Sequence, residues 1–182
     1  MEVFDTNIDG LKLVKPIVWG DPRGYFVETW QKNRYESIGI DMPFVQDNHS
    51  KSQKNILRGL HVQRNKPQGK LVSVSLGAVY DVAVDIRKES STFGAWYGVE
   101  LSAENQHQLW IPPGLAHGFV VISDTANFHY KCTEFYYPED EYTIIWNDSE
   151  LQIKWPVENP ILSAKDAQGV TLKAYQNMGL RR

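Results

Sequence analysis

The sequence has almost no cysteine and no apolar run that is long enough to cross a membrane. Cys132 is the only cysteine among 182 residues, so neither an intrachain disulfide nor a zinc site built from cysteines can form. The apolar stretch 119–122 is far shorter than the roughly 20 residues of a membrane-spanning helix. The acidic start, Met1 to Asp5, lacks the apolar core of a signal peptide. We therefore expect a cytoplasmic protein that does not associate with membranes.

The chain also has little excess charge of either sign. It has 19 basic and 22 acidic residues and a net charge of -3, which gives no reason to expect a nucleic-acid partner. A local cluster of Arg and Lys can still bind a small anion. The length fits one domain over residues 1–182, with a core that buries roughly 70% of the surface of the unfolded chain. We expect the 6 Trp and 9 Tyr mainly to pack such a core rather than to stack on a base or a sugar.

Short apolar runs that alternate with turn signals predict an all-β fold. Residues 71–76 and 79–87 flank Gly77 and predict a two-stranded hairpin. Further short strands are predicted at 98–101, 108–111, 118–122 and 127–132. Many short strands at near-regular spacing are typical of a sandwich or a barrel. Helical structure is expected only at 32–38, ended by Gly39, and in a turn at 163–166 that Ser163 can cap.

Strand alternation places Asp81 and Asp85 on one face of the strand at 79–87. Two acids on one face need water or a cation, and Lys70 on the preceding strand is a candidate partner for one of them. A pair of acids that simply faces solvent fits the pattern equally well.

Three cationic or titratable side chains form the most informative group. His61 follows the segment Leu57-Arg58-Gly59-Leu60, Lys70 follows closely, and His117 comes after a Pro-Pro-Gly turn. Each alone has an ordinary explanation, as a hydrogen-bonded histidine, a surface lysine or a turn residue. Together they supply a base, a fixed positive charge and a hydrogen-bond donor. This set suits the removal of a proton beside a ketone, because the cation can hold the enolate.

Strict alternation would separate Arg58 from His61, since it places them on opposite faces of their strand. Both can line one pocket only if Gly59 permits a bulge or if Arg58 reaches round the barrel mouth.

A metal site has to be considered, because Pro112-x-Gly114-x-x-His117 resembles the second metal motif of the cupins. The first cupin motif is His-x-His, followed by a glutamate and, after six intervening residues, a glycine. This chain has His61-x-Gln63, and Lys70 occupies the place of the glutamate ahead of Gly77. Because an ammonium group repels a divalent cation, the sequence predicts a cupin-type barrel without a metal.

The ordered set of motifs resembles the dTDP-4-dehydrorhamnose 3,5-epimerase family over nearly the whole chain. The matching segments are residues 21–28, 44–50, 57–63, 70–72, 81–87, 111–119, 130–133 and 163–166. The resemblance implies a cupin-type jelly-roll β-barrel with short helical segments.

The resemblance also implies the role of each site residue. His61 would be the base, Asp166 would orient it, and Tyr130 would be the acid on the opposite face of the sugar. Lys70 would support the enolate and contact the substrate. The other implied substrate contacts are Arg23, Glu28, Gln46, Asn48, Arg58, His117, Glu141 and Lys165.

The implied activity is that of an isomerase which needs no cofactor and which acts at carbons 3 and 5 of a dTDP-4-dehydro sugar in L-rhamnose biosynthesis. Relatives are dimers, so a homodimer is expected. Three alternatives stay open: an epimerase that inverts one carbon only, a metal-dependent cupin enzyme, and a non-catalytic sugar-binding cupin. One departure is visible, because Tyr142 and Thr143 follow Glu141 where relatives commonly have Arg-Gly. The tail after Lys173 carries no functional pattern.

Overall fold

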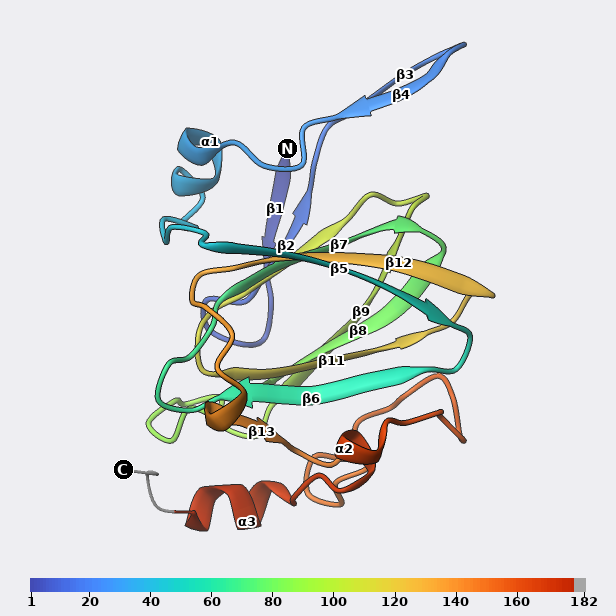
Figure 1. Cartoon of the computed structure of the whole chain (residues 1–182). Coiled ribbons are helices and arrows are strands. Elements are labelled where there is room, and N and C mark those ends of the chain that lie inside the picture. Colours follow the sequence, from blue (N-terminus) through green and yellow to red (C-terminus); the bar gives the residue numbers. More distant parts are fainter. Residues whose placement is uncertain (179–182) are drawn as a thin grey trace.

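Two antiparallel sheets face each other and enclose the core (Figure 1). The computed structural model describes residues 1–178. The six-stranded sheet contains, in spatial order, β1 (Glu2–Asp5), β2 (Lys12–Lys15), β10 (Gln108–Ile111), β7 (Lys70–Leu76), β12 (Thr125–Cys132) and β5 (Gln46–Gln53). The five-stranded sheet contains β13 (Glu141–Thr143), β6 (Leu57–Gln63), β11 (Leu115–Val121), β8 (Ala78–Asp85) and β9 (Trp96–Ser102).

A two-stranded arm and four short helical segments complete the described structure. The arm consists of β3 (Val18–Asp21) and β4 (Gly24–Val27), and it projects away from the barrel (Figure 1). The helical segments are α1 (Lys32–Glu36), η1 (Pro138–Asp140), α2 (Ala164–Ala167) and α3 (Leu172–Asn177). Helix α1 lies within the predicted range 32–38, α2 overlaps the predicted turn at 163–166, and Ser163 caps α2 as predicted. No helix within residues 1–178 is both long enough and apolar enough to span a membrane.

From β5 to β13 the chain changes sheet at every connection except that between β8 and β9, and this confirms the predicted all-β jelly-roll barrel of the cupin type. The predicted hairpin of β7 and β8 is wrong, because the two strands belong to different sheets. Gly77 turns a corner between the sheets with φ of +72°. A Cβ atom there would lie 1.9 Å from the carbonyl oxygen of Thr125, so only glycine fits this corner.

Strand β8 is buried on both faces. The inner face packs into the core between the sheets, where Phe119 and Phe128 stack with ring centroids 4.1 Å apart. The outer face is covered by the C-terminal segment, including Leu172 and Tyr175 of α3 (Figure 1). No face of β8 is therefore left for solvent.

This double cover corrects the prediction for the two aspartates of β8. Asp81 and Asp85 share the inner face, but both are fully buried, and neither makes an ion pair or a hydrogen bond with Lys70. Asp81 contacts His117, and its Oδ2 lies 2.9 Å from His117 Nε2. Asp85 accepts hydrogen bonds from the Arg87 guanidinium and from the hydroxyls of Ser90 and Thr92.

The pairing of β6 with β11 contains a bulge, which is one of the two arrangements that allow Arg58 and His61 to line one pocket. His61 pairs with His117 and Arg58 pairs with Phe119, so two residues of β6 oppose the single residue Gly118. The extra residue reverses the alternation, and Arg58 and His61 line the same cavity. Of the two arrangements that the sequence left open, the structure contains the bulge.

The network around Asp85 predicts a pH-dependent contribution to stability. Burial would raise the pKa of Asp85, but the Arg87, Ser90 and Thr92 bonds outweigh it and lower the pKa well below its usual range. A lowered folded-state pKa stabilises the fold above the unfolded value of about 3.9, and the contribution is lost as pH falls. We expect Asp85→Asn to cost about 3 kcal/mol at pH 7. The deficit should shrink below about pH 4.

Urea unfolding of both proteins at pH 7 and pH 3 measures the effect, and the exposed Asp124 provides a control through Asp124→Asn. A deficit of the same size at both pH values would contradict the assignment.

Candidate active site

A cavity of about 290 Å³ opens between the two sheets. One wall comes from β6 and β11 of the five-stranded sheet, and the other comes from β5, β7 and β12 of the six-stranded sheet. Nine of the predicted site residues line it: Gln46, Asn48, Arg58, His61, Lys70, His117, Tyr130, Glu141 and Lys165. The remaining lining residues are Ser50, Gln68, Phe119, Phe128, Cys132 and Tyr136.

Asp166 lies directly behind His61. Its Oδ1 is 2.6 Å from His61 Nε2, and its backbone N–H donates to the capping hydroxyl of Ser163. Burial would raise the pKa of Asp166, but the contact with His61 outweighs burial and lowers it. A charged carboxylate therefore fixes the imidazole ring through Nε2. This leaves Nδ1 as the ring nitrogen that can accept a proton.

Glu141 forms a second carboxylate beside the same histidine. Its Oε1 lies 3.8 Å from His61 Nδ1, while its Oε2 accepts hydrogen bonds from Lys165 Nζ at 2.6 Å and from the Tyr136 hydroxyl at 3.0 Å. Burial would raise the pKa of Glu141, but the Lys165 bond and the nearby His61 lower it overall. The cavity wall therefore carries an ionised carboxylate at neutral pH.

Lys70 is a basic group without a fixed partner. Lys70 is the first residue of β7 and lines the cavity. Its Nζ makes no hydrogen bond or ion pair with any residue in 1–178. Burial lowers the pKa of Lys70, whereas Cys132 and Glu141 act in the opposite direction. A half-buried ammonium group with free donors is suited to an anion that develops in the cavity.

His117 is held in a second histidine–aspartate contact. It is 6% exposed, and its Nε2 lies 2.9 Å from Asp81 Oδ2. Burial lowers the pKa of His117, although Asp81 opposes that shift. The ring also stacks on Phe128, with centroids 6.0 Å apart. His117 is therefore a rigid part of the wall beside His61.

Tyr130 stands on β12, in the sheet opposite that of His61. Burial raises the pKa of Tyr130, with nearby Arg58 opposing the shift. The phenol therefore stays protonated through neutral pH and can donate. His61 can accept a proton from one wall while Tyr130 donates from the other.

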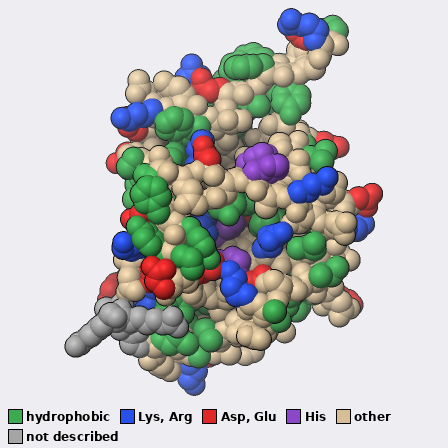
Figure 2. All heavy atoms as spheres, viewed as in Figure 1, with side chains coloured by type: hydrophobic (Ala, Val, Ile, Leu, Met, Phe, Trp, Pro, Cys, Tyr) green, Lys and Arg blue, Asp and Glu red, His purple; other side chains and the backbone are tan. Residues whose placement is uncertain are grey.

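Three predicted site residues do not line this cavity: Asp166, which lies behind His61, and Arg23 and Glu28, which lie apart from it. Arg23 lies in the turn of the arm and pairs with Asp21, while Glu28 pairs with Arg34 at 3.1 Å. In the space-filling view the arm stands clear of the body, with basic side chains at its tip (Figure 2). Within one chain, the structure separates these two residues from the other predicted contacts.

Tyr136 is a cavity residue that sequence reasoning missed. Its side chain lines the cavity and is 47% exposed, and its backbone N–H donates to Gln46 Oε1. The only available signal was the run of three aromatic residues at 135–137, directly after the segment 130–133.

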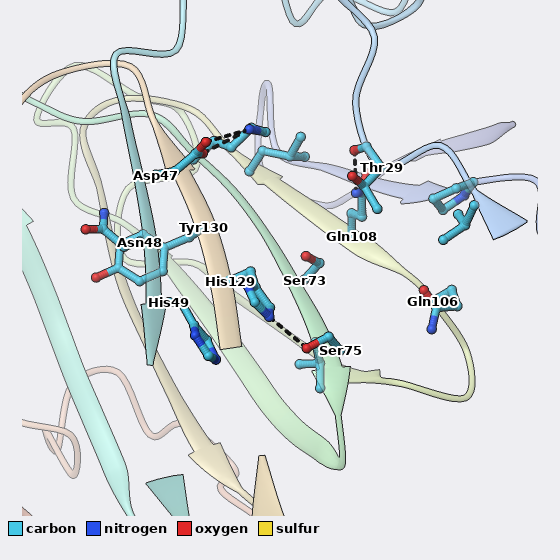
Figure 3. Close-up of a pocket in the computed structure, with 15 residues that line it drawn as sticks. Thr29, Asp47, Asn48, His49, Ser73, Ser75, Gln106, Gln108, His129 and Tyr130 are labelled. Carbon is cyan, nitrogen blue, oxygen red and sulfur yellow. Dashed lines mark hydrogen bonds and ion pairs between the residues drawn. The ribbon is translucent and has the colours of Figure 1, made fainter. Parts of the chain in front are cut away.

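A second and larger hollow of about 450 Å³ lies on the outer face of the six-stranded sheet (Figure 3). His49 and His129 stack there with ring centroids 4.3 Å apart, and His129 contacts Ser75 Oγ. His61, Lys70 and Asp166 do not line this hollow. The cavity between the sheets is therefore the candidate active site.

Comparisons with known proteins agree with this assignment. Residues 5–174 match the family model described as dTDP-4-dehydrorhamnose 3,5-epimerase. A dTDP-4-dehydrorhamnose 3,5-epimerase of Salmonella typhimurium is 56% identical, with 92% of this chain and 93% of the relative covered. A dTDP-6-deoxy-D-glucose-3,5-epimerase of Legionella pneumophila, crystallised with dTDP-4-keto-L-rhamnose, is 53% identical with a TM-score of 0.92, covering 94% and 93% of the chains.

A more distant relative bears on specificity. A dTDP-4-dehydrorhamnose 3-epimerase of Streptomyces niveus is 35% identical, with 99% of this chain and 88% of the relative covered.

The opposed effects of burial and of Lys165 on the pKa of Glu141 give a prediction for Lys165→Met. Removing the ammonium group leaves the burial of Glu141 without its main offset, so we expect the pKa of Glu141 to rise. Carbon-13 NMR titration of labelled glutamate side chains measures this shift. Lys131→Met, which removes the partner of Asp47, is the control and should leave Glu141 unchanged. An unaltered pKa of Glu141 in Lys165→Met would contradict the proposed balance.

Proposed function

This chain belongs to the dTDP-4-dehydrorhamnose 3,5-epimerase family, and we propose that it converts dTDP-4-dehydro-6-deoxy-D-glucose to dTDP-4-dehydro-L-rhamnose. One observation supports this above all: His61 and Tyr130 line one cavity from opposed sheets. Inversion of a carbon centre requires removal of a proton from one face and its return to the other. Carbons 3 and 5 both flank the ketone, so one base and one acid can serve both.

In this mechanism His61 is the base and Asp166 keeps it in place. Nδ1 removes the proton next to the ketone, and the electrons of that C–H bond pass into an enolate whose oxygen lies beside Lys70. Asp166 stabilises the imidazolium that forms, because its carboxylate contacts Nε2 at 2.6 Å. Tyr130 then gives its phenolic proton to the opposite face of the carbon. Exchange with solvent restores the proton of Tyr130 and removes that of His61.

The other cavity residues are proposed to hold the nucleotide and its diphosphate. Arg58 uses Nε to donate to Ser52 Oγ at 3.0 Å, which leaves its terminal nitrogens for phosphate oxygens. Gln46 and Asn48 are joined by a hydrogen bond of 3.0 Å and present amides at the same wall. His117, Glu141 and Lys165 complete the proposed substrate contacts. No metal or cofactor is part of the mechanism, because the ketone already activates the neighbouring hydrogens.

We further propose a homodimer in which the arm of one subunit completes the cavity of the other. The arm exposes large apolar side chains: Val18, Trp19, Tyr25 and Phe26 are 42–66% exposed. Apolar surface on a projecting two-stranded arm favours cover by a partner. Such an arrangement would let Arg23 and Glu28 act as ligand contacts although they lie outside the cavity of their own chain. The cytoplasm is the proposed location, in keeping with a single free cysteine.

The roles of His61 and Tyr130 are separated by replacing each in turn. His61→Asn should lower turnover by at least about 10²-fold, as expected for loss of a general base. Tyr130→Phe should retain part of the hydrogen exchange with solvent while losing most of the inverted product. Proton NMR in deuterated water, which counts exchange at carbons 3 and 5, is compared with product stereochemistry.

Near-normal exchange in His61→Asn would remove His61 from its role. Equal retention of exchange and inversion in Tyr130→Phe would do the same for Tyr130. In the wild-type enzyme, exchange at only one carbon would instead indicate an epimerase that inverts a single centre.

The dimer proposal predicts that activity depends on the arm. Light scattering at assay concentration should give twice the mass of the chain, and Arg23→Ala should raise KM while leaving the fold intact. Mixing inactive His61→Asn with weak-binding Arg23→Ala subunits should restore some wild-type sites, because each site draws on two chains. Full activity in a monomer, or no restoration on mixing, would rule out a shared site.

A further inference from the structure

Gln63, the last residue of β6, ties together two loops at the cavity mouth. Its side chain is buried, with a relative exposure of 4%. Nε2 donates to the carbonyl oxygens of Lys66 at 2.8 Å and Phe135 at 3.0 Å, while Oε1 accepts from the backbone N–H of Tyr137 at 2.8 Å. Both amide protons and the amide oxygen are therefore used on backbone groups.

The two loops carry residues of the active site. Residues 64–69 lead from β6 to Lys70, and residues 133–137 lead from β12 past Tyr136. The first loop is also fixed by Asp140, whose carboxylate accepts from the backbone N–H groups of Asn65 and Lys66. Gln63 links this anchored loop to the second.

Tyr136 lies between the two positions that Gln63 fixes in the second loop. The carbonyl of Phe135 and the N–H of Tyr137 flank it and are both bonded to Gln63. The Tyr136 hydroxyl donates to Glu141 Oε2 at 3.0 Å. Although Tyr136 is 47% exposed, hydrogen bonds of the neighbouring backbone groups fix its main chain and the bond to Glu141 fixes its hydroxyl.

We propose that Gln63 is a positioning residue that presets Tyr136, and with it the wall formed by Glu141 and Lys165, to receive the sugar nucleotide. The inference rests on the proposed function and deepens it. Gln63 does not line the cavity, so it acts through Tyr136 rather than by touching the ligand. Fixing the loop before binding reduces the conformational entropy that binding would otherwise cost.

This role also accounts for a sequence feature that the mechanism leaves unused. Gln63 occupies the second ligand place of the His-x-His metal motif to which His61 belongs. An amide can donate twice and accept once, so at this place it can join three backbone groups. The side chain serves the loops rather than the interior of the barrel.

Kinetics separate positioning from a merely structural role. Gln63→Leu should raise KM by about tenfold, the effect of one lost hydrogen bond, with kcat changed less than about threefold. Leu101→Ala, a core change away from the cavity, controls for lost stability and should leave KM unaltered. Gln63→Glu retains the acceptor for Tyr137 but places a carboxylate against two carbonyls. It keeps the shape of the side chain should Gln63→Leu fail to fold, and it should raise KM similarly.

A double-mutant cycle with Tyr136→Leu tests the route of the effect. If Gln63 acts through Tyr136, the KM effect of Gln63→Leu should largely vanish in the Tyr136→Leu background. If the KM of the double variant rises by the product of the two single-variant fold-changes, the proposal is overturned. An unchanged KM in both Gln63→Leu and Gln63→Glu would also overturn it.

Amide hydrogen exchange of the segment 133–140 provides a readout that needs no substrate. Exchange of the Tyr137 amide should accelerate in Gln63→Leu, because its acceptor is removed. Unchanged protection of this amide would also overturn the positioning role of Gln63. If the wild-type enzyme fails to epimerise the dTDP sugar while this exchange effect holds, the proposed function is wrong, but Gln63 still fixes the loop.

Discussion

The close approach of Gly59 and Gly118 determines which side chains enter the cavity. A Cβ atom on Gly59 would lie 2.6 Å from the Gly118 Cα, and one on Gly118 would lie 2.6 Å from the carbonyl oxygen of Arg58. Only two glycines allow β6 and β11 to pair at this distance, and the bulge forms there. Because the bulge reverses the alternation of β6, Arg58 and His61 line the same cavity. The positions of Arg58, the proposed phosphate-binding group, and of His61, the proposed base, thus depend on a backbone contact.

The charges of the cavity follow a second constraint, which is that buried charges need partners. Asp166 is matched by His61 and Glu141 by Lys165, and the pKa of each carboxyl is lowered by its partner in spite of burial. Lys70 is the exception in the described chain, since it makes no ion pair and burial lowers its pKa. In the proposed mechanism, the cost of this unpartnered ammonium group is offset when the enolate forms beside it. This cost is consistent with a site that binds the transition state better than the substrate.

Local patterns predicted the elements well and their partners poorly. The strand predicted at 108–111 has the bounds of β10, and a bulge at Gly59 was one of the two arrangements expected to bring Arg58 and His61 together. The hairpin at Gly77 was wrong because one glycine can turn either a hairpin or a corner, and the choice depends on distant pairing. Asp81 and Asp85 were misjudged for a related reason, since alternation cannot reveal that a C-terminal segment covers the outer face. Tyr136 was missed because its place depends on bonds to Gln63 and Gln46, both remote in sequence.

The two-sheet architecture itself bears on stereochemistry. Residues on one strand can offer groups to only one side of a flat substrate, whereas His61 and Tyr130 belong to sheets that enclose the cavity. The separation of the proposed acid from the proposed base is thus a property of the barrel, and small side-chain motions cannot exchange their faces. Tyr130 also stands next to Phe128, which packs on Phe119 in the core, so the position of the acid depends on the packing between the sheets. The core between the sheets therefore stabilises the fold and also positions the proposed acid.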